Sequence, residues 1–298
     1  MSWFRENERV WKEIIETVSN ETMRSRIMIE KDTIQSVFLY ELSKYDFPFV
    51  FKGGTSLSKS YDLIDRFSED IDLSLSRKIK DSERKKSKEI ILEIADKLDF
   101  VLTNPDNVLS RRNYNKYIFT YDSLFSDDKL EIIIETSYFQ ESFPVVSRNI
   151  QSFVGKFCKI KNVVMPIDFP AVEFEMNVQS LQRTFIDKVF AVCDYWIENM
   201  MDRDSRHLYD IAKIVPVIVF DDYLKELIVR VRNDRMKSIN NPSADLEKNI
   251  NQILKNIIET DFYKKDYNNI TTKLLYEKYP YGDAIKNGIK VVLEKNVF

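Results

Sequence analysis

Two glycines, two hydroxyl side chains and two aspartates lie close together near the start of the sequence. The run from Lys52 to Ser56 contains Gly53, Gly54 and Thr55, and Asp70-Ile71-Asp72 follows it. Glycine lets the backbone approach a ligand closely, and its N–H groups can hold phosphate oxygens. Side chains alternate between the faces of a strand, so Asp70 and Asp72 would project the same way, roughly 6–7 Å apart. Two such carboxylates beside a phosphate-binding turn can hold Mg²⁺ against a nucleoside triphosphate, which predicts nucleotidyl transfer.

A third carboxylate could complete this metal site. Residues 129–138 are rich in β-branched side chains, which predicts a strand. Glu131 and Glu135 share one face of it, and spacing alone leaves both open as the third ligand, with a solvent-facing glutamate at a sheet edge as the alternative. The metal, Mg²⁺ with Mn²⁺ as a second candidate, would bridge phosphate oxygens and activate the acceptor hydroxyl.

A second group of charged residues occurs later in the chain. Lys188 lies among apolar neighbours, so we expect its ammonium group to point into a cleft or to extend outward to solvent. Arg206 and Asp210 are spaced i,i+4 and could form a pair on a helix surface. His207 is the single histidine of the chain, and we interpret it as a packing or hydrogen-bonding residue in preference to a catalytic base.

Periodicity predicts the elements that must hold these residues. Apolar residues at helical spacing predict helices over residues 5–18, 30–43 and 80–98, and a Gly-Gly loop followed by a helix of about ten residues. Apolar runs predict strands at residues 47–51, 71–75, 100–102, 116–121 and 129–138. Helical periodicity dominates from Val178 onward. We therefore predict an α/β domain with a mixed sheet over residues 1–175 and a helical domain over residues 176–298 that contributes Lys188 and Asp210 to the cleft.

Composition limits the class of protein and its location. The chain has 45 basic and 48 acidic residues, a balance that neither establishes nor excludes an RNA substrate. Cys158 and Cys193 show no metal-binding or disulfide spacing, which is typical of reduced thiols in an intracellular protein. The apolar run at residues 214–220 contains Pro216 and is too short to span a bilayer, and the N-terminus has no apolar signal region. We predict a soluble cytoplasmic protein without a membrane partner.

Taken together, these motifs resemble the AbiEii/AbiGii family of nucleotidyltransferase-like toxins, relatives of the MenT toxins within the polymerase-β-like superfamily. The resemblance is carried by several blocks in one order. They are Ile29-Glu30-Lys31-Asp32, the run from Phe51 to Lys59, the run from Arg66 to Leu73, the strand with Glu135, Arg183-Thr184-Phe185 with Lys188, and the run from Arg206 to Asp210.

The resemblance implies roles for individual residues. The residues expected to bind the nucleotide are Lys52, Gly53, Gly54, Thr55, Ser56, Lys188 and Arg206. The expected metal ligands are Asp70, Asp72 and Glu135, the last favoured because the family's third acidic residue precedes a small residue and a downstream proline, here Pro144. The expected catalytic residues are Asp70, Asp72, Lys188 and Asp210, with Arg206 positioning that late aspartate or the nucleotide. A glutamate in place of the third aspartate departs from the family pattern.

The resemblance also implies an activity. We expect a Mg²⁺-dependent nucleotidyltransferase, the toxin of a type IV toxin–antitoxin or abortive-infection system. It would transfer a nucleoside monophosphate from an NTP to an acceptor such as tRNA, with release of pyrophosphate and with an antitoxin as partner. One alternative is transfer onto a protein hydroxyl, as in AMPylation. Another is a nucleotide-binding protein without turnover that acts through protein contacts.

Overall fold

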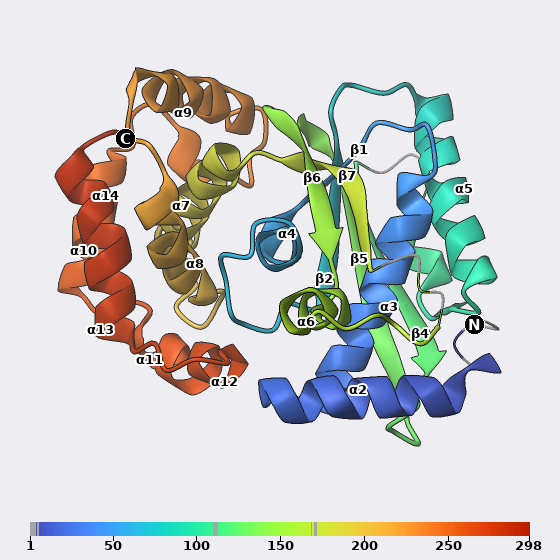
Figure 1. Ribbon diagram of the computed structural model, residues 1–298. Coiled ribbons are helices and arrows are strands. Elements are labelled where there is room, and N and C mark those ends of the chain that lie inside the picture. The colour runs from blue at the N-terminus through green and yellow to red at the C-terminus, as the bar shows by residue number, and fades with distance from the viewer. Residues whose placement is uncertain (1–3, 5, 110–112, 168, 170–171) are drawn as a thin grey trace. The chain divides into compact units, whose positions relative to one another are not determined.

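The computed structural model describes residues 4, 6–109, 113–167, 169 and 172–298, and the chain divides into two compact units (Figure 1). The first, which we call the α/β unit, consists of residues 1–60 and 68–178. The second, the helical unit, consists of residues 61–67 and 179–298. A short segment between two parts of the α/β unit therefore folds with the helical unit. In the described part of the chain, every helix is too short or too polar to cross a membrane.

The α/β unit is built on one mixed sheet, which confirms the predicted class. The strands are β1 (Phe49–Lys52), β2 (Asp70–Leu75), β3 (Val101–Leu102), β4 (Tyr114–Asp122), β5 (Lys129–Glu141), β6 (Val145–Gln151) and β7 (Glu173–Gln179). Their order is β3-β4-β5-β2-β1-β7-β6. Strand β2 pairs antiparallel with β1 and parallel with β5, while β4 pairs antiparallel with β5. The two strands that carry the predicted acidic residues are thus neighbours at the centre of the sheet.

Helices flank this sheet, and we call its partly exposed face, defined by Asp70 and Asp72 of β2, the open face. The helices of the unit are α2 (Glu8–Thr22), α3 (Arg26–Ser43), α4 (Gly53–Lys59), α5 (Asp81–Lys97) and α6 (Phe153–Lys161), with a 3₁₀ turn at Pro105–Asn107. Helix α3 packs against α5 and α6, and α2 runs across α3 (Figure 1). In β2, Ile71 and Leu73 are buried while Asp70 and Asp72 are partly exposed. The period of two therefore directs the aspartates to the open face.

The helical unit confirms the predicted change of class after the sheet. Its helices are α7 (Leu181–Ile197), α8 (Arg206–Ile214), α9 (Asp222–Arg235), α10 (Ile250–Glu259), α11 (Lys264–Asp266), α12 (Thr272–Leu274), α13 (Tyr281–Ala284) and α14 (Lys290–Lys295), with 3₁₀ turns at Val215–Val217 and Pro242–Ala244 and π-helical turns at Tyr267–Thr271 and Ile285–Ile289. Helix α8 lies against the second π-helical turn because Gly288 is small. A Cβ there would lie 3.1 Å from the Ala212 nitrogen.

The structure differs from the predicted elements at two places. Helix α4 begins at Gly53 directly after β1, with no intervening loop, and has seven residues. Strands β6 and β7 and helix α6 fall in a region where no element was predicted. Most residues of β6 are half-buried or exposed, so this edge strand carries few of the apolar residues on which such a prediction depends. Strand β7 continues through residue 175, the predicted end of the first domain.

Candidate functional site

A row of four charged side chains crosses four neighbouring strands of the sheet. Lys52 on β1 is paired with Asp72 on β2, and Asp72 is paired with Glu135 on β5. Glu135 is paired in turn with Lys116 on β4. Residues paired in this way point to the same face of a sheet. We call Lys52, Asp72, Glu135 and Lys116 the charged row; Asp70 precedes it by two residues on the same face.

The carboxylate of Asp72 lies against the first glycine of helix α4. A Cβ built on Gly53 would be 1.9 Å from Asp72 Oδ2, and Gly53 has a φ of 78°, a conformation that residues with side chains rarely adopt. Both the space and the backbone conformation therefore require glycine here. The strand-to-helix turn brings the first N–H groups of α4 close to the aspartate pair.

The hydroxyl side chains of α4 join it to β2. Thr55 Oγ1 donates to the Asp70 carbonyl and lies 2.9 Å from Ser68 Oγ, while Ser56 Oγ donates to the Gly53 carbonyl at 2.9 Å. Both residues are buried. Because both hydroxyls donate hydrogen bonds to backbone carbonyls, a phosphate at this turn would be held mainly by backbone N–H groups. Gln35 of α3 donates to the Glu69 carbonyl at 2.6 Å and holds the start of the same strand.

Strand register distinguishes the two candidate glutamates. Glu135 is the direct partner of Asp72, whereas Glu131 lies four positions earlier in β5 opposite Thr120, roughly 13 Å away along the strand. The Glu135 carboxylate contacts Lys116 Nζ at 3.2 Å and accepts a hydrogen bond from the Tyr114 hydroxyl.

The pKa of Tyr114 also depends on the nearby carboxylates. The pKa of its hydroxyl is raised by burial and then by the charges of Glu135, Asp72 and Asp70. All three acidic side chains are therefore near one point at the start of β4.

The donor set suits a magnesium ion that shares its ligands with a nucleotide. Asp70 and Asp72 supply the carboxylate oxygens that Mg²⁺ prefers, and in nucleotide sites the ion usually takes one or two carboxylates plus phosphate oxygens and water. Over the described ranges, no three or more Asp, Glu, His or Cys side chains are arranged to hold a metal by themselves. Glu135 is engaged by Lys116 and Tyr114. The residues present thus fit a two-carboxylate site completed by a ligand.

The helical unit contains a buried cluster of Arg66, Asp210 and Lys188. Arg66 donates to both carboxylate oxygens of Asp210, at 2.7 and 2.8 Å, and Lys188 Nζ lies 2.6 Å from Asp210 Oδ2. All three side chains are at least 94% buried. Burial alone would raise the pKa of Asp210, but Arg66 and Lys188 hold it well below its ordinary value. Two cations thus share one carboxylate, which leaves a net positive charge that a phosphate group could neutralise.

His207 and Arg206 lie beside this cluster and contact it differently from what i,i+4 spacing suggested. His207 Nδ1 is 3.3 Å from Lys188 Nζ, and its ring stacks on Tyr195. Burial and then the Lys188 charge lower the pKa of His207 to about 4, so the ring is neutral at pH 7. Arg206 pairs with Asp204 at 2.9 Å, and Asp210 is held by Arg66 instead.

Sequence reasoning did not single out three residues that hold the predicted site in place. Arg66 was seen only as part of a motif block, and its partner is 144 positions away in the chain. Lys116 lies in the strand predicted at residues 116–121, and Tyr114 lies just before it but inside the observed β4, so alternation gave neither residue a role. The sequence feature that could have identified Lys116 was its positive charge on the face of the sheet that carries the acidic residues.

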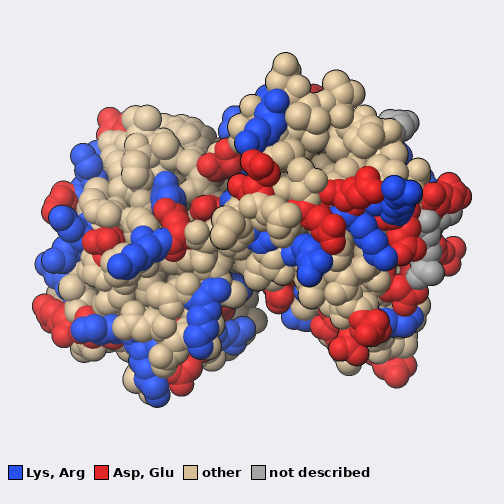
Figure 2. Space-filling view, turned by 60° about the horizontal axis from the view of Figure 1, so that its bottom comes forward, with Lys and Arg blue, Asp and Glu red and all other residues tan. Residues whose placement is uncertain are grey.

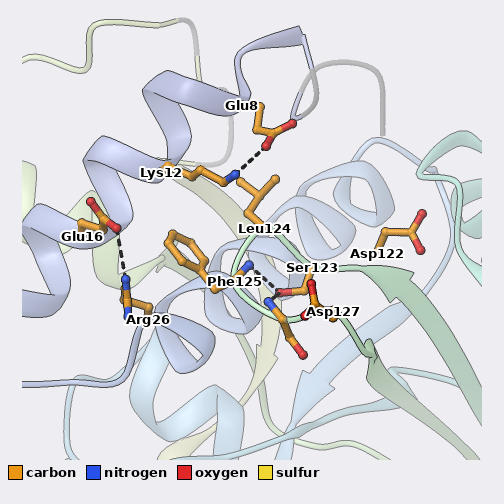
Figure 3. A pocket seen from close by; sticks show the side chains of 10 residues that line it. Glu8, Lys12, Glu16, Arg26, Asp122, Ser123, Leu124, Phe125 and Asp127 are labelled. Atoms are coloured by element: carbon orange, nitrogen blue, oxygen red, sulfur yellow. Dashed lines mark hydrogen bonds and ion pairs between the residues drawn. The ribbon is translucent and has the colours of Figure 1, made fainter.

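A cavity of about 620 Å³ lies at the other end of the β4–β5 pair (Figure 3). It is lined by Glu8, Lys12 and Glu16 of α2, by Arg26 of α3 and by the turn at residues 122–127. Lys12 contacts Glu8 at 2.6 Å and Arg26 contacts Glu16 at 3.1 Å. Six positions of strand β4, from Lys116 to Asp122, separate the charged row from this cavity, roughly 20 Å along the strand.

Comparisons with known proteins found a family model and similar solved structures. A family model described as "Nucleotidyl transferase AbiEii toxin, Type IV TA system" matches residues 37–287. The structure of MenT4, a nucleotidyltransferase toxin from Mycobacterium tuberculosis, is similar with a TM-score of 0.50 at 14% identity, over 94% of this chain and 87% of that one. JHP933 from Helicobacter pylori is similar with a TM-score of 0.39 at 14% identity, over 84% of this chain and 97% of that one. No curated protein sequence matches the chain.

Proposed function

The chain belongs to the AbiEii family of nucleotidyltransferase toxins from type IV toxin–antitoxin systems, and from this premise we propose that it transfers a nucleoside monophosphate from an NTP to tRNA. The observation that carries the proposal is the contact of Asp72 with Gly53 inside the charged row. It joins a carboxylate pair to a backbone turn that can bind phosphate, as the reaction requires. An antitoxin protein is the expected partner of such a toxin.

Each group of residues has a separate task in the proposed reaction. The N–H groups of Gly53 and Gly54, together with Lys52, bind the triphosphate and orient its α-phosphorus. Asp70 and Asp72 would hold Mg²⁺, which supplies charge stabilisation on the phosphates when it is bound. The acceptor oxygen forms a bond to the α-phosphorus, the bond to the pyrophosphate oxygen breaks, and the acceptor hydroxyl gives its proton to solvent water.

Lys188 and Asp210 form a buried ion pair. We propose that the Lys188 ammonium group supplies positive charge within the helical unit and that Asp210 fixes its position. Because the pKa of Asp210 is well below its ordinary value, this carboxylate is a poor proton acceptor at neutral pH. We therefore assign Asp210 a positioning role, and Arg66 the role of holding Asp210.

The distribution of charge on one face of the molecule bears on how an RNA acceptor would be held. On the face drawn in Figure 2, Lys and Arg side chains are interspersed with Asp and Glu, without a continuous basic tract over the residues coloured there. Broad phosphate contacts normally make nucleic-acid binding steeply dependent on salt. This face therefore offers no extended tract for such contacts among the residues coloured there.

Incubation with each α-³²P-labelled NTP and Mg²⁺, with total tRNA and cell protein supplied separately, tests the proposal. We expect label on tRNA and release of pyrophosphate, and the nucleotide that labels identifies the base. Label on protein would support AMPylation-type transfer instead. NTP binding without label on either acceptor would support a binding protein without turnover.

Replacing Gly53 with alanine is expected to reduce transfer at least about a hundredfold. The new Cβ would collide with Asp72 Oδ2, and the positive φ would be strained, so the carboxylate must move away from its position. Gly282→Ala is the matched control, because a Cβ at Gly282 meets no atom within 4 Å. Transfer rates of the two variants should therefore differ widely, and equal rates would contradict the role of the Gly53 contact.

A further inference from the structure

Lys116 contacts the one carboxylate of the charged row that a metal ion would need as a third ligand. Its Nζ lies 3.2 Å from Glu135 Oε1, and the Tyr114 hydroxyl donates to the same carboxylate. Lys116 is 41% exposed and Glu135 23% exposed, so the pair can open without unfolding of the strand. Glu135 thus carries two donors on the open face of the sheet.

A second lysine on the same two strands shows what an ordinary pair looks like. Lys129 of β5 is paired with Asp122 of β4, at 3.3 Å and with both side chains more than half exposed. Asp122 lies on the same face as Lys116, six positions farther along β4. Cross-strand pairs of this kind contribute little to stability. The Lys116 pair differs because the other neighbour of Glu135 is Asp72, a predicted metal ligand.

We propose that Lys116 competes with the metal ion for Glu135 and so keeps this carboxylate out of the metal site until nucleotide is bound. The inference rests on the proposed function, because it assumes that Asp70 and Asp72 hold a divalent ion. A divalent cation and an ammonium group repel each other strongly at distances of a few ångströms. An ion that used Glu135 must therefore displace Lys116. The phosphates of a bound NTP supply the negative charge that can accept the displaced ammonium group.

Binding of Mn²⁺ to the full chain without nucleotide, followed by electron paramagnetic resonance, tests this role directly. We expect Lys116→Met to bind Mn²⁺ about tenfold more tightly than the wild type, because the competing cation is gone. Lys116→Arg keeps the charge and should retain the wild-type affinity. Lys129→Met is the matched control and should change the affinity less than twofold. A variant that was merely less stable would not gain metal affinity.

The outcomes separate the two proposals. Wild-type protein that binds Mn²⁺ and transfers label, together with unchanged affinity in Lys116→Met, would overturn the role of Lys116 and leave the proposed function intact. Wild-type protein that neither binds Mn²⁺ nor transfers label would overturn both. Tighter binding in Lys116→Met that is lost again when Asp72→Asn is added would support both.

Discussion

Asp72→Asn is expected to reduce nucleotide transfer roughly a thousandfold, equivalent to about 4 kcal/mol of transition-state stabilisation. Asparagine has nearly the shape of aspartate and can occupy the same space beside Gly53, so the fold should be retained. It lacks the negative charge that a divalent ion needs, and its neighbour Glu135 is already engaged by Lys116. The measurement is the initial rate of transfer from the preferred labelled NTP to tRNA. Growth arrest on expression should be lost with it.

Asp122→Asn is the control for this change. Asp122 lies on the same face of the sheet, on strand β4, which β5 separates from β2; it pairs with Lys129 and has no place in the proposed reaction. Its replacement should leave the transfer rate within twofold of the wild type. An Asp72→Asn variant that transfers nucleotide as fast as Asp122→Asn would remove the aspartate pair from the mechanism.

Arg66→Met is expected to destabilise the helical unit by about 3–5 kcal/mol, because it removes one partner of a buried ion pair and leaves Asp210 with Lys188 alone. Chemical denaturation at pH 7, followed by circular dichroism, measures the loss of free energy of unfolding. The folded-state pKa of Asp210 is below its ordinary value of 3.8. Its contribution is therefore fully present above about pH 4 and is lost as the pH falls through the folded-state pKa.

Arg206→Met is the matched control for this effect. Arg206 belongs to the same unit and pairs with Asp204, but a third of its side chain is exposed. Partly exposed ion pairs contribute at most about 1 kcal/mol. If Arg66→Met were no more destabilising than Arg206→Met, the buried cluster would not stabilise the unit as we describe.

The parts of the site that depend on local sequence could be predicted, and those that depend on pairing between distant segments could not. Asp70 and Asp72 share a face because of the period of a single strand, and a helix follows the apolar run as predicted, although it begins at Gly53 itself without the predicted loop. Spacing alone could not choose between Glu131 and Glu135, since both lie on one face. The choice depends on the register between β2 and β5, which is fixed by tertiary packing.

The partner of Asp210 shows the same limit more strongly. The spacing of Arg206 and Asp210 made a local ion pair plausible, yet Asp210 forms its ion pair with Arg66, 144 positions earlier. Burial decides this pairing. A fully buried carboxylate needs a cation that reaches both of its oxygens, and Arg66 does so from the segment at residues 61–67. The mixed sheet and the later helices required only periodicity, and these predictions were confirmed.

The segment at residues 61–67 limits how the chain can be divided into two separate fragments. The chain leaves the α/β unit after residue 60, contributes Arg66 to the helical unit, and returns at residue 68. No single cut therefore separates the two units. A fragment ending near residue 178 would carry Arg66 without Asp210, and the complementary fragment would carry Asp210 without Arg66. Exchange of helical units between related toxins would thus require three matched crossovers, two of them between the glycine turn and the aspartate pair.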